Sequence, residues 1–230
     1  SSDFPATSGP GYDKTLSVRD AFVVKLNAQG TGVVYATYLG GTHGLYDEGY
    51  AIAVDASGYA YITGKADSSD FPTTAGAYDT SPNGGGDAFI TKLSLTGTSL
   101  AYSTFVGGND WDGGDGIVVD VVGNAYIAGH TRSPDFPTSV VSLDRTLGGD
   151  FDGFVFKINT TGTTVLYSTY IGGSSEDWAR ALALGSSGNI HVAGWTSSAD
   201  FPTTPGAFGT TYRGGGDVFL SKLNPAGDAF

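Results

Sequence analysis

The segment DAFITKL at residues 87–93 decides the fold of this chain, because it occurs four times in slightly altered form. Its alternation of side chains along the segment is typical of a β-strand. The other copies keep its length, its opening Asp and its penultimate Lys, and lie at 20–26 (DAFVVKL), 152–158 (DGFVFKI) and 217–223 (DVFLSKL). Spacings of 67, 65 and 65 residues are those of an internal structural repeat.

Further motifs return at the same spacing and complete the repeat unit. YSTFVGG at 102–108 reads as one strand, and GIVVDVVGNAYIAG at 116–129 reads as two strands joined by a tight turn. Four short strands per unit without helical periodicity indicate a β-propeller blade. We name the strands A to D in the order of a blade. The compact apolar strand A, 116–119 in this copy, is predicted to lie innermost because the central axis leaves little room for aromatic side chains.

The chain resembles the SBBP-type β-propeller repeats, a seven-bladed family of secreted bacterial and archaeal proteins. The resemblance covers nearly the whole chain and rests on DAFITKL (87–93), GNAYIAGHTRSPDFPT (123–138) and YSTYIGGSSEDWARALAL (167–184). It implies a propeller outside the cytoplasm, secreted or at the cell surface, and it brings no defined reaction with it.

The predicted fold is an all-β propeller of four-stranded antiparallel blades, with about 3.5 repeats in one domain or propeller segment over 1–230. Thirteen strands are expected: strands C–D of one blade (20–41), two full blades (49–108 and 115–173) and strands A–C of another (180–223). Because propellers usually close with about 4 to 8 blades, exposed blade edges are expected. Such edges predict either a homo-oligomer or part of a longer propeller chain.

The composition excludes several classes of partner. A net charge of −12 would repel phosphate backbones and anionic lipid, so nucleic-acid binding is not expected. No apolar run approaches the about 18 to 20 residues of a membrane helix, so membrane insertion is not expected either. The absence of cysteine excludes disulfide and thiolate chemistry.

The ligand site is expected at the end of the propeller that carries the long connections. Strand alternation places the short A–B and C–D turns at one end and the longer B–C and D–A connections at the other. At that end, residues that differ between copies are the better binding candidates. The predicted ligand-binding residues are Lys65, Trp111, His130, Trp178 and Trp195. Tryptophan beside carboxylates commonly holds sugar rings; the alternative, packing between blades, is favoured for Trp178.

The loop GGNDWDGGDG at 107–116 has two interpretations. Asp110, Asp112 and Asp115 could supply oxygen ligands to calcium, although their spacing does not fit an EF-hand. No cofactor is expected to be required, and Ca²⁺ is the single candidate. The alternative is structural, with a carboxylate that accepts backbone N–H bonds at each inter-blade crossover. It is favoured because this position carries Asp in each repeat, at Asp47, Asp112 and Asp177.

The repeated DFPT segments are also predicted to be structural. Asp starts a turn, Pro fixes φ and Phe supplies an apolar anchor for a long connection. The anchors are Phe4, Phe71, Phe136 and Phe201.

Catalysis is not expected from this sequence. Of its three histidines (His43, His130 and His191), His191 replaces a tyrosine of the other copies and is interpreted as a packing variant. A glycosidase-type carboxylate pair could form among Asp110, Asp112, Asp115 and Glu176, and this enzyme hypothesis is the weakest. The predicted function is a non-catalytic module that binds a glycan or a surface protein. The alternative is an architectural element that assembles through exposed blade edges.

Overall fold

The computed structural model describes residues 4–5 and 9–230, and this part of the chain is all-β with thirteen strands, as predicted. The strands form four antiparallel sheets, which we number as blades 1 to 4. Their bounds, blade by blade, are β1 (Ala21–Leu26) and β2 (Val33–Leu39); β3 (Asp47–Val54), β4 (Ala60–Ala66), β5 (Asp87–Leu93) and β6 (Leu100–Val106); β7 (Asp112–Val119), β8 (Ala125–Thr131), β9 (Asp152–Ile158) and β10 (Val165–Ile171); β11 (Asp177–Leu184), β12 (Ile190–Thr196) and β13 (Asp217–Leu223).

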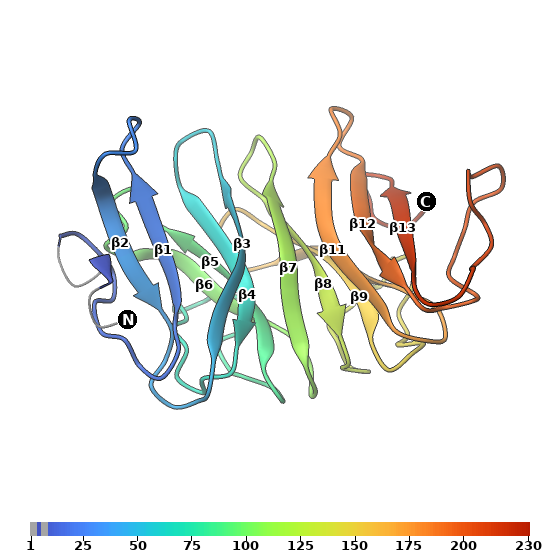
Figure 1. The fold of residues 1–230 in the computed structure, drawn as a ribbon, viewed down its shortest axis with the longest axis horizontal. Helices are drawn as coiled ribbons and strands as arrows, with labels where there is room; N and C mark the ends of the chain where they lie inside the picture. Colours follow the sequence, from blue (N-terminus) through green and yellow to red (C-terminus); the bar gives the residue numbers. More distant parts are fainter. Residues whose placement is uncertain (1–3, 6–8) are drawn as a thin grey trace.

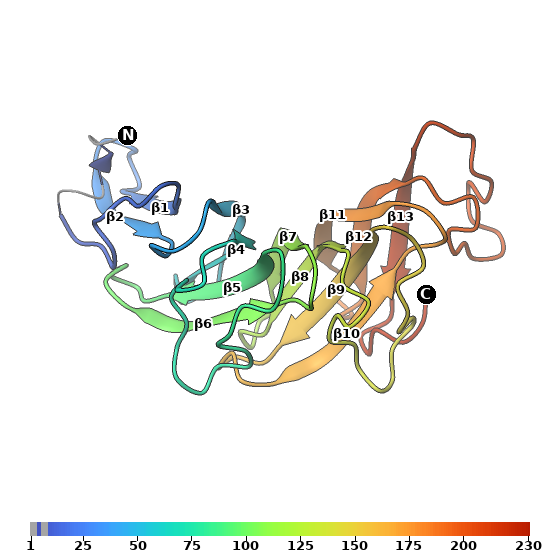
Figure 2. The ribbon, with the colours of Figure 1, turned by 90° about the horizontal axis from the view of Figure 1, so that it is seen from below.

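The sheets are arranged as propeller blades. Blades 2 and 3 each run in the order A–B–C–D, blade 1 contains strands C and D, and blade 4 contains A, B and C. Figure 2 shows them as an arc, with the A strands β3, β7 and β11 on its inner side and β6 and β10 on its outer side. The A strands contact one another, β3 with β7 and β7 with β11, so the prediction that strand A is innermost is confirmed.

The hydrophobic core lies between blades rather than inside any one of them. Every residue of β5 except Lys92 is buried, because the neighbouring blades cover both faces of this sheet. One core cluster contains Ala88 and Ile90 of blade 2 together with Phe154 and Phe156 of blade 3. Burial of a phenylalanine of this kind contributes about 1.5 to 3 kcal/mol, so each blade depends on its neighbour for stability.

Each inner strand begins before the apolar run that the sequence analysis used to place it. The strands start at Asp47, Asp112 and Asp177, rather than at 49, 115 and 180. The pairing of A with B shifts register in the first half of each inner strand, for example between Gly114 and Gly116. The extra residue of such a bulge interrupts the alternation that a sequence pattern detects, while the strand itself continues.

The long B–C connections all leave the propeller at the same end, as predicted. The D–A connections lie at this end too, but the prediction that they are long is wrong: the inner strands begin earlier than expected and leave connections of five to seven residues, similar to the turns at the other end. The A–B turns lie at the upper end of the view in Figure 1, whereas the chain enters the A strands at the lower end. We call this lower end the loop end. It carries the B–C connections at 67–86, 132–151 and 197–216 and the D–A connections at 40–46, 107–111 and 172–176.

Candidate functional site

The recurrent aspartate closes each crossover between blades at the loop end. Asp112 is 1% exposed, and its Oδ2 accepts bonds from the Gly108 N–H (2.8 Å) and the Ser133 hydroxyl (2.9 Å). Asp177 does the same with the Gly173 N–H (2.7 Å) and the Ser198 hydroxyl (2.6 Å). A buried carboxylate that accepts such bonds ties strand D of one blade to strands A and B of the next, which is the arrangement the structural interpretation predicts.

The acids of the 107–116 loop do not converge on a common point. Asp110 accepts a bond from the N–H of its own neighbour Trp111 (3.0 Å), and Asp115 bonds to His130 and Arg180. Within residues 4–5 and 9–230, no group of three or more His, Asp or Glu side chains is placed to hold a metal ion. The described part of the chain therefore offers no such cluster for the calcium interpretation.

The DFPT phenylalanines pack against strand C of their own blade. Phe71 and Phe136 are each 3% exposed, and their ring centroids lie 4.6 and 4.5 Å from those of Phe89 and Phe154. Phe201 is half-buried and makes the same contact with Phe219 at 4.5 Å. These contacts anchor the long B–C connections, so the loop end has a fixed shape on which a site can be built.

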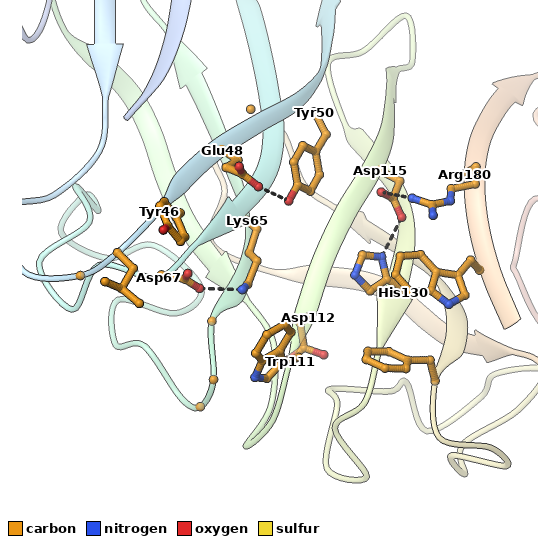
Figure 3. Close-up of a pocket in the computed structure, with 18 residues that line it drawn as sticks. Tyr46, Glu48, Tyr50, Lys65, Asp67, Trp111, Asp112, Asp115, His130 and Arg180 are labelled. Atoms are coloured by element: carbon orange, nitrogen blue, oxygen red, sulfur yellow. Dashed lines mark hydrogen bonds and ion pairs between the residues drawn. The ribbon is translucent and has the colours of Figure 1, made fainter. Parts of the chain in front are cut away.

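A cavity of about 1110 Å³ lies at the loop end beside the inner strands. Figure 3 shows Tyr46, Glu48 and Tyr50 of blade 2 on one side of it and Asp115, His130 and Arg180 on the other. Part of its lining comes from the positions one before, one after and three after the recurrent aspartate. The residues at these positions differ in every copy. They are Tyr46, Glu48 and Tyr50; Trp111, Gly113 and Asp115; and Glu176, Trp178 and Arg180, and all of them except Gly113 and Glu176 line the cavity.

Trp111 presents an open aromatic surface in this cavity. It is 52% exposed, and the Nζ of Lys65 lies 4.1 Å from its ring centroid. Lys65 is in turn paired with Asp67, whose Oδ1 lies 2.8 Å from the Nζ. The structure therefore brings together two predicted ligand-binding residues, Lys65 and Trp111, and the cation–π contact holds the indole in place.

The other three predicted binding residues form a stack that crosses from blade 3 to blade 4. His130 lies on Trp178 with centroids 3.8 Å apart and planes 22° apart, and Trp178 stacks on Trp195 at 6.0 Å and 16°. Gly113, which pairs with His130 across strands A and B, lacks the side chain that would occupy the place of the imidazole. His130 and Trp178 line the cavity, but Trp195 does not, so its predicted ligand contact has no geometric support.

Ion pairs balance the charges within the cavity. The Asp115 side chain is 8% exposed; its Oδ2 lies 2.8 Å from His130 Nδ1 and its Oδ1 lies 3.0 Å from Arg180 Nη1. Arg180 also lies over Trp178, with 4.2 Å between the guanidinium carbon and the ring centroid. The four acids of the glycosidase hypothesis lie in different places: Asp112 bonds in the crossover, Asp115 is ion-paired in the cavity, and Asp110 and Glu176 do not line the cavity.

The sequence analysis missed Tyr46, Glu48 and Tyr50, which line the cavity on the side of blade 2. Tyr46 and Tyr50 are each 44% exposed, and the Tyr50 hydroxyl donates to Glu48 Oε2 at 2.6 Å. Burial, followed by this bond to Glu48, raises the pKa of Tyr50 well above its ordinary value, so the phenol keeps its proton. Alignment of the copies contained the signal, because Tyr46, Glu48 and Tyr50 stand where the other blades have unrelated residues.

Comparison with known families agrees with this architecture. The model of a family described as a beta-propeller repeat, SBBP, matches residues 34–72 and 166–202, segments that run from strand D of one blade into the DFPT connection of the next. Comparison with curated proteins finds no match to the chain. In the described residues, no helix has the length and apolarity to cross a membrane. The match and the four sheets agree on a β-propeller architecture, and residues 34–72 and 166–202 are similar to SBBP beta-propeller repeats.

Proposed function

We propose that this protein is a non-catalytic extracellular binding module that holds a neutral glycan in the loop-end cavity. The observation that carries the proposal is the set of exposed rings around the cavity, Tyr46 and Tyr50 at 44% and Trp111 at 52%. Large aromatic surfaces beside hydrogen-bonding groups suit sugars, whose C–H faces stack on rings while their hydroxyls find polar partners.

The charges of the cavity favour a neutral ligand over an acidic one. Lys65 is paired with Asp67, and Arg180 with Asp115, so a sulfated or carboxylated sugar would have to displace an internal carboxylate to reach either cation. The net charge of −12 adds repulsion at long range. Hydroxyl groups, by contrast, can both donate to Glu48 or Asp67 and accept from Lys65 without separating a pair.

The repeat itself supports binding rather than catalysis. The blades share one fold but carry different residues at equivalent cavity positions, so the binding surface varies while the scaffold stays the same. The cavity spans three blades, as suits a chain of sugars, and its acids are engaged in ion pairs or in the crossovers. The proposed location outside the cell follows the resemblance to secreted repeat proteins.

Titration of the protein against neutral oligosaccharides, first on an array and then by calorimetry, tests the proposal. Trp111→Ala should weaken binding at least about tenfold, since interface tryptophans commonly contribute 2 kcal/mol or more. Phe208→Ala is the matched control, because Phe208 is a fully exposed aromatic ring that does not line the cavity. Both variants should keep the wild-type melting temperature. Silence of the wild type on neutral glycans, or full binding by Trp111→Ala, would contradict the proposal.

A further inference from the structure

The two ends of the blade arc expose residues that are buried everywhere else. On β13, Val218 is 86% and Leu220 is 76% exposed. Their equivalents on β5, Ala88 and Ile90, are 0% exposed, as is Val155, the equivalent of Leu220 on β9. Within residues 4–5 and 9–230, no blade packs on this side of blade 4, although the equivalent sides of blades 2 and 3 are each covered by the next blade. We call the face that contains Val218 and Leu220 the trailing face.

The interfaces between blades 2 and 3 and between blades 3 and 4 show which residues cover such a face. Ile90 of blade 2 shares a core cluster with Phe154 on strand C of blade 3. Val155 of blade 3 shares a cluster with Phe219 on strand C of blade 4. In each case an aliphatic residue on strand C shares a core cluster with the phenylalanine that stands third in the seven-residue strand C motif of the next blade. A trailing face thus requires a phenylalanine at that position.

The opposite end of the chain exposes this phenylalanine. Phe22 on β1 is 62% exposed, whereas its equivalents Phe89 and Phe154 are 0% exposed. Its ring already has the partner that the interior copies have, since the centroid of Phe4 lies 4.9 Å away. The side of blade 1 that contains Phe22, which we call the leading face, is thus formed before anything packs on it.

We propose that the trailing face of one copy packs on the leading face of a second copy, so that the chain assembles head to tail. In this assembly, Leu220 of one molecule packs against Phe22 of the next molecule. This contact is equivalent to the one between Ile90 and Phe154 within the chain. The contact continues the inter-blade interface already present between blades 2, 3 and 4. Two different faces meet, so the association is heterologous, and successive copies either close a ring or extend.

The open strand edges strengthen this assignment. β13 pairs with β12 alone and β1 with β2 alone, while β5 and β9 each pair on both sides. Unpaired backbone groups next to an exposed apolar face favour the approach of another sheet. This assembly uses the ends of the arc and leaves the loop-end cavity uncovered, so it goes beyond the proposed glycan binding and does not depend on it.

Sedimentation velocity over a concentration series tests the proposal on the chain as it stands. The wild type should shift to species larger than a monomer as its concentration rises. Leu220→Lys and Phe22→Lys should each remove this shift, because each places a charge on one of the two faces. The control is Val121→Lys, at a fully exposed turn position far from either face, which should associate like the wild type.

Mixing the two blocked variants distinguishes head-to-tail contact from any symmetric one. Leu220→Lys retains a leading face and Phe22→Lys retains a trailing face, so an equimolar mixture should form a dimer that cannot grow. Variants that stay monomeric when mixed would overturn the proposal, provided that their melting curves show them folded. A wild type that is monomeric at every concentration would also overturn it, and would leave a further repeat joined to the chain as the occupant of these faces.

Discussion

Asp112 and its sequence neighbours Trp111 and Gly113 have different roles: Asp112 belongs to the repeated scaffold, and its two neighbours belong to the surface that differs between blades. Asp112 is buried, hydrogen-bonded across two blades and the same in each repeat. Trp111 is half exposed in the cavity, and Gly113 makes room for His130; neither is repeated. Because side chains on a strand alternate between two sides, one short segment serves both the crossover and the cavity. Identity between copies therefore marks the scaffold, and difference marks the surface available for recognition.

Replacement of adjacent residues on the two sides should give the largest contrast. Asp47→Ala removes the acceptor of four bonds, from the N–H groups of Gly41, Asp67 and Ser68 and from the Ser68 hydroxyl. We expect a loss of roughly 3 to 5 kcal/mol in the free energy of unfolding, measured by urea denaturation, since buried donors are left without partners. Glu48→Ala, one residue away at the cavity, should cost less than about 1 kcal/mol. Equal costs would abolish the distinction between the two sides.

Two glycines in adjacent pairs of the same strands offer a finer contrast. A Cβ on Gly129, a repeated position, would lie 1.9 Å from the carbonyl oxygen of Gly113, which is backbone and cannot move aside cheaply. A Cβ on Gly113, a position that differs between copies, would meet the imidazole of His130 at 2.6 Å, and that ring can turn away. We expect Gly129→Ala to cost about 3 kcal/mol or more and Gly113→Ala about 1 kcal/mol or less.

Thermal melting checks the stabilities of both glycine variants, and tryptophan fluorescence checks the ring stack. Gly113→Ala should alter the emission of Trp178, which stacks on His130, while the melting temperature stays near that of the wild type. A Gly113→Ala protein with unaltered emission would mean that the stack does not depend on the missing side chain.

Buried carboxyls at the loop end, one in a crossover and two at the start of strand C, should also make stability depend on pH. Burial and, to a smaller extent, the charge of Asp112 raise the pKa of Asp87 to about 7, although the hydrogen bond from the Asn83 N–H acts to lower it. Burial also raises the pKa values of Asp112 and Asp152 to about 6. Carboxyls with raised pKa values contribute stability that is complete below their unfolded value near 4 and is lost as the pH rises through 6 to 7. We therefore expect the free energy of unfolding, measured by urea denaturation, to fall by on the order of 2 kcal/mol between pH 5 and pH 8.

Other carboxyls oppose this trend in strong acid. Desolvation would raise the pKa of Asp70, but hydrogen bonds from Thr42 and His43 hold it well below its usual range. Its contribution is present above the unfolded value and is lost as the pH falls through the folded value, so stability should peak at mildly acidic pH. Asp87→Asn imitates the protonated acid and should flatten the alkaline side of the profile. A wild-type profile that is flat from pH 5 to pH 8 would contradict this account.

The sequence predicted the scaffold closely because the repeat aligns every strand with its copies. Strand order, the inner position of β3, β7 and β11, and the common end of the long connections all follow from period-2 patterns seen several times over. The starts of the inner strands were missed, since the bulge at Gly114–Gly116 breaks the pattern within a continuous strand. A sequence pattern detects the alternation of side chains along a strand, but it does not detect which backbone groups pair between strands.

The candidate site was predictable only in part. Lys65, His130 and Trp111 were found because they differ from their equivalents or are rare, and all three line the cavity. Tyr46 and Tyr50 were overlooked because tyrosine is common in these strands, and their exposure depends on the open space between inner strands. Trp195 lies against Trp178, as its predicted place at the loop end implies, but outside the cavity lining; its position depends on how β11 pairs with β12, which sequence spacing does not report.

The ring stack of His130, Trp178 and Trp195 is an intrinsic fluorescent probe of the relative position of blades 3 and 4. It spans the boundary between two blades, so any twisting or parting of those blades must slide or separate the rings. Two of the three tryptophans of the chain belong to this stack, and the third stands in the cavity. The native emission of the protein should therefore report, without any attached dye, on the boundary between blades 3 and 4 and on the cavity surface beside it.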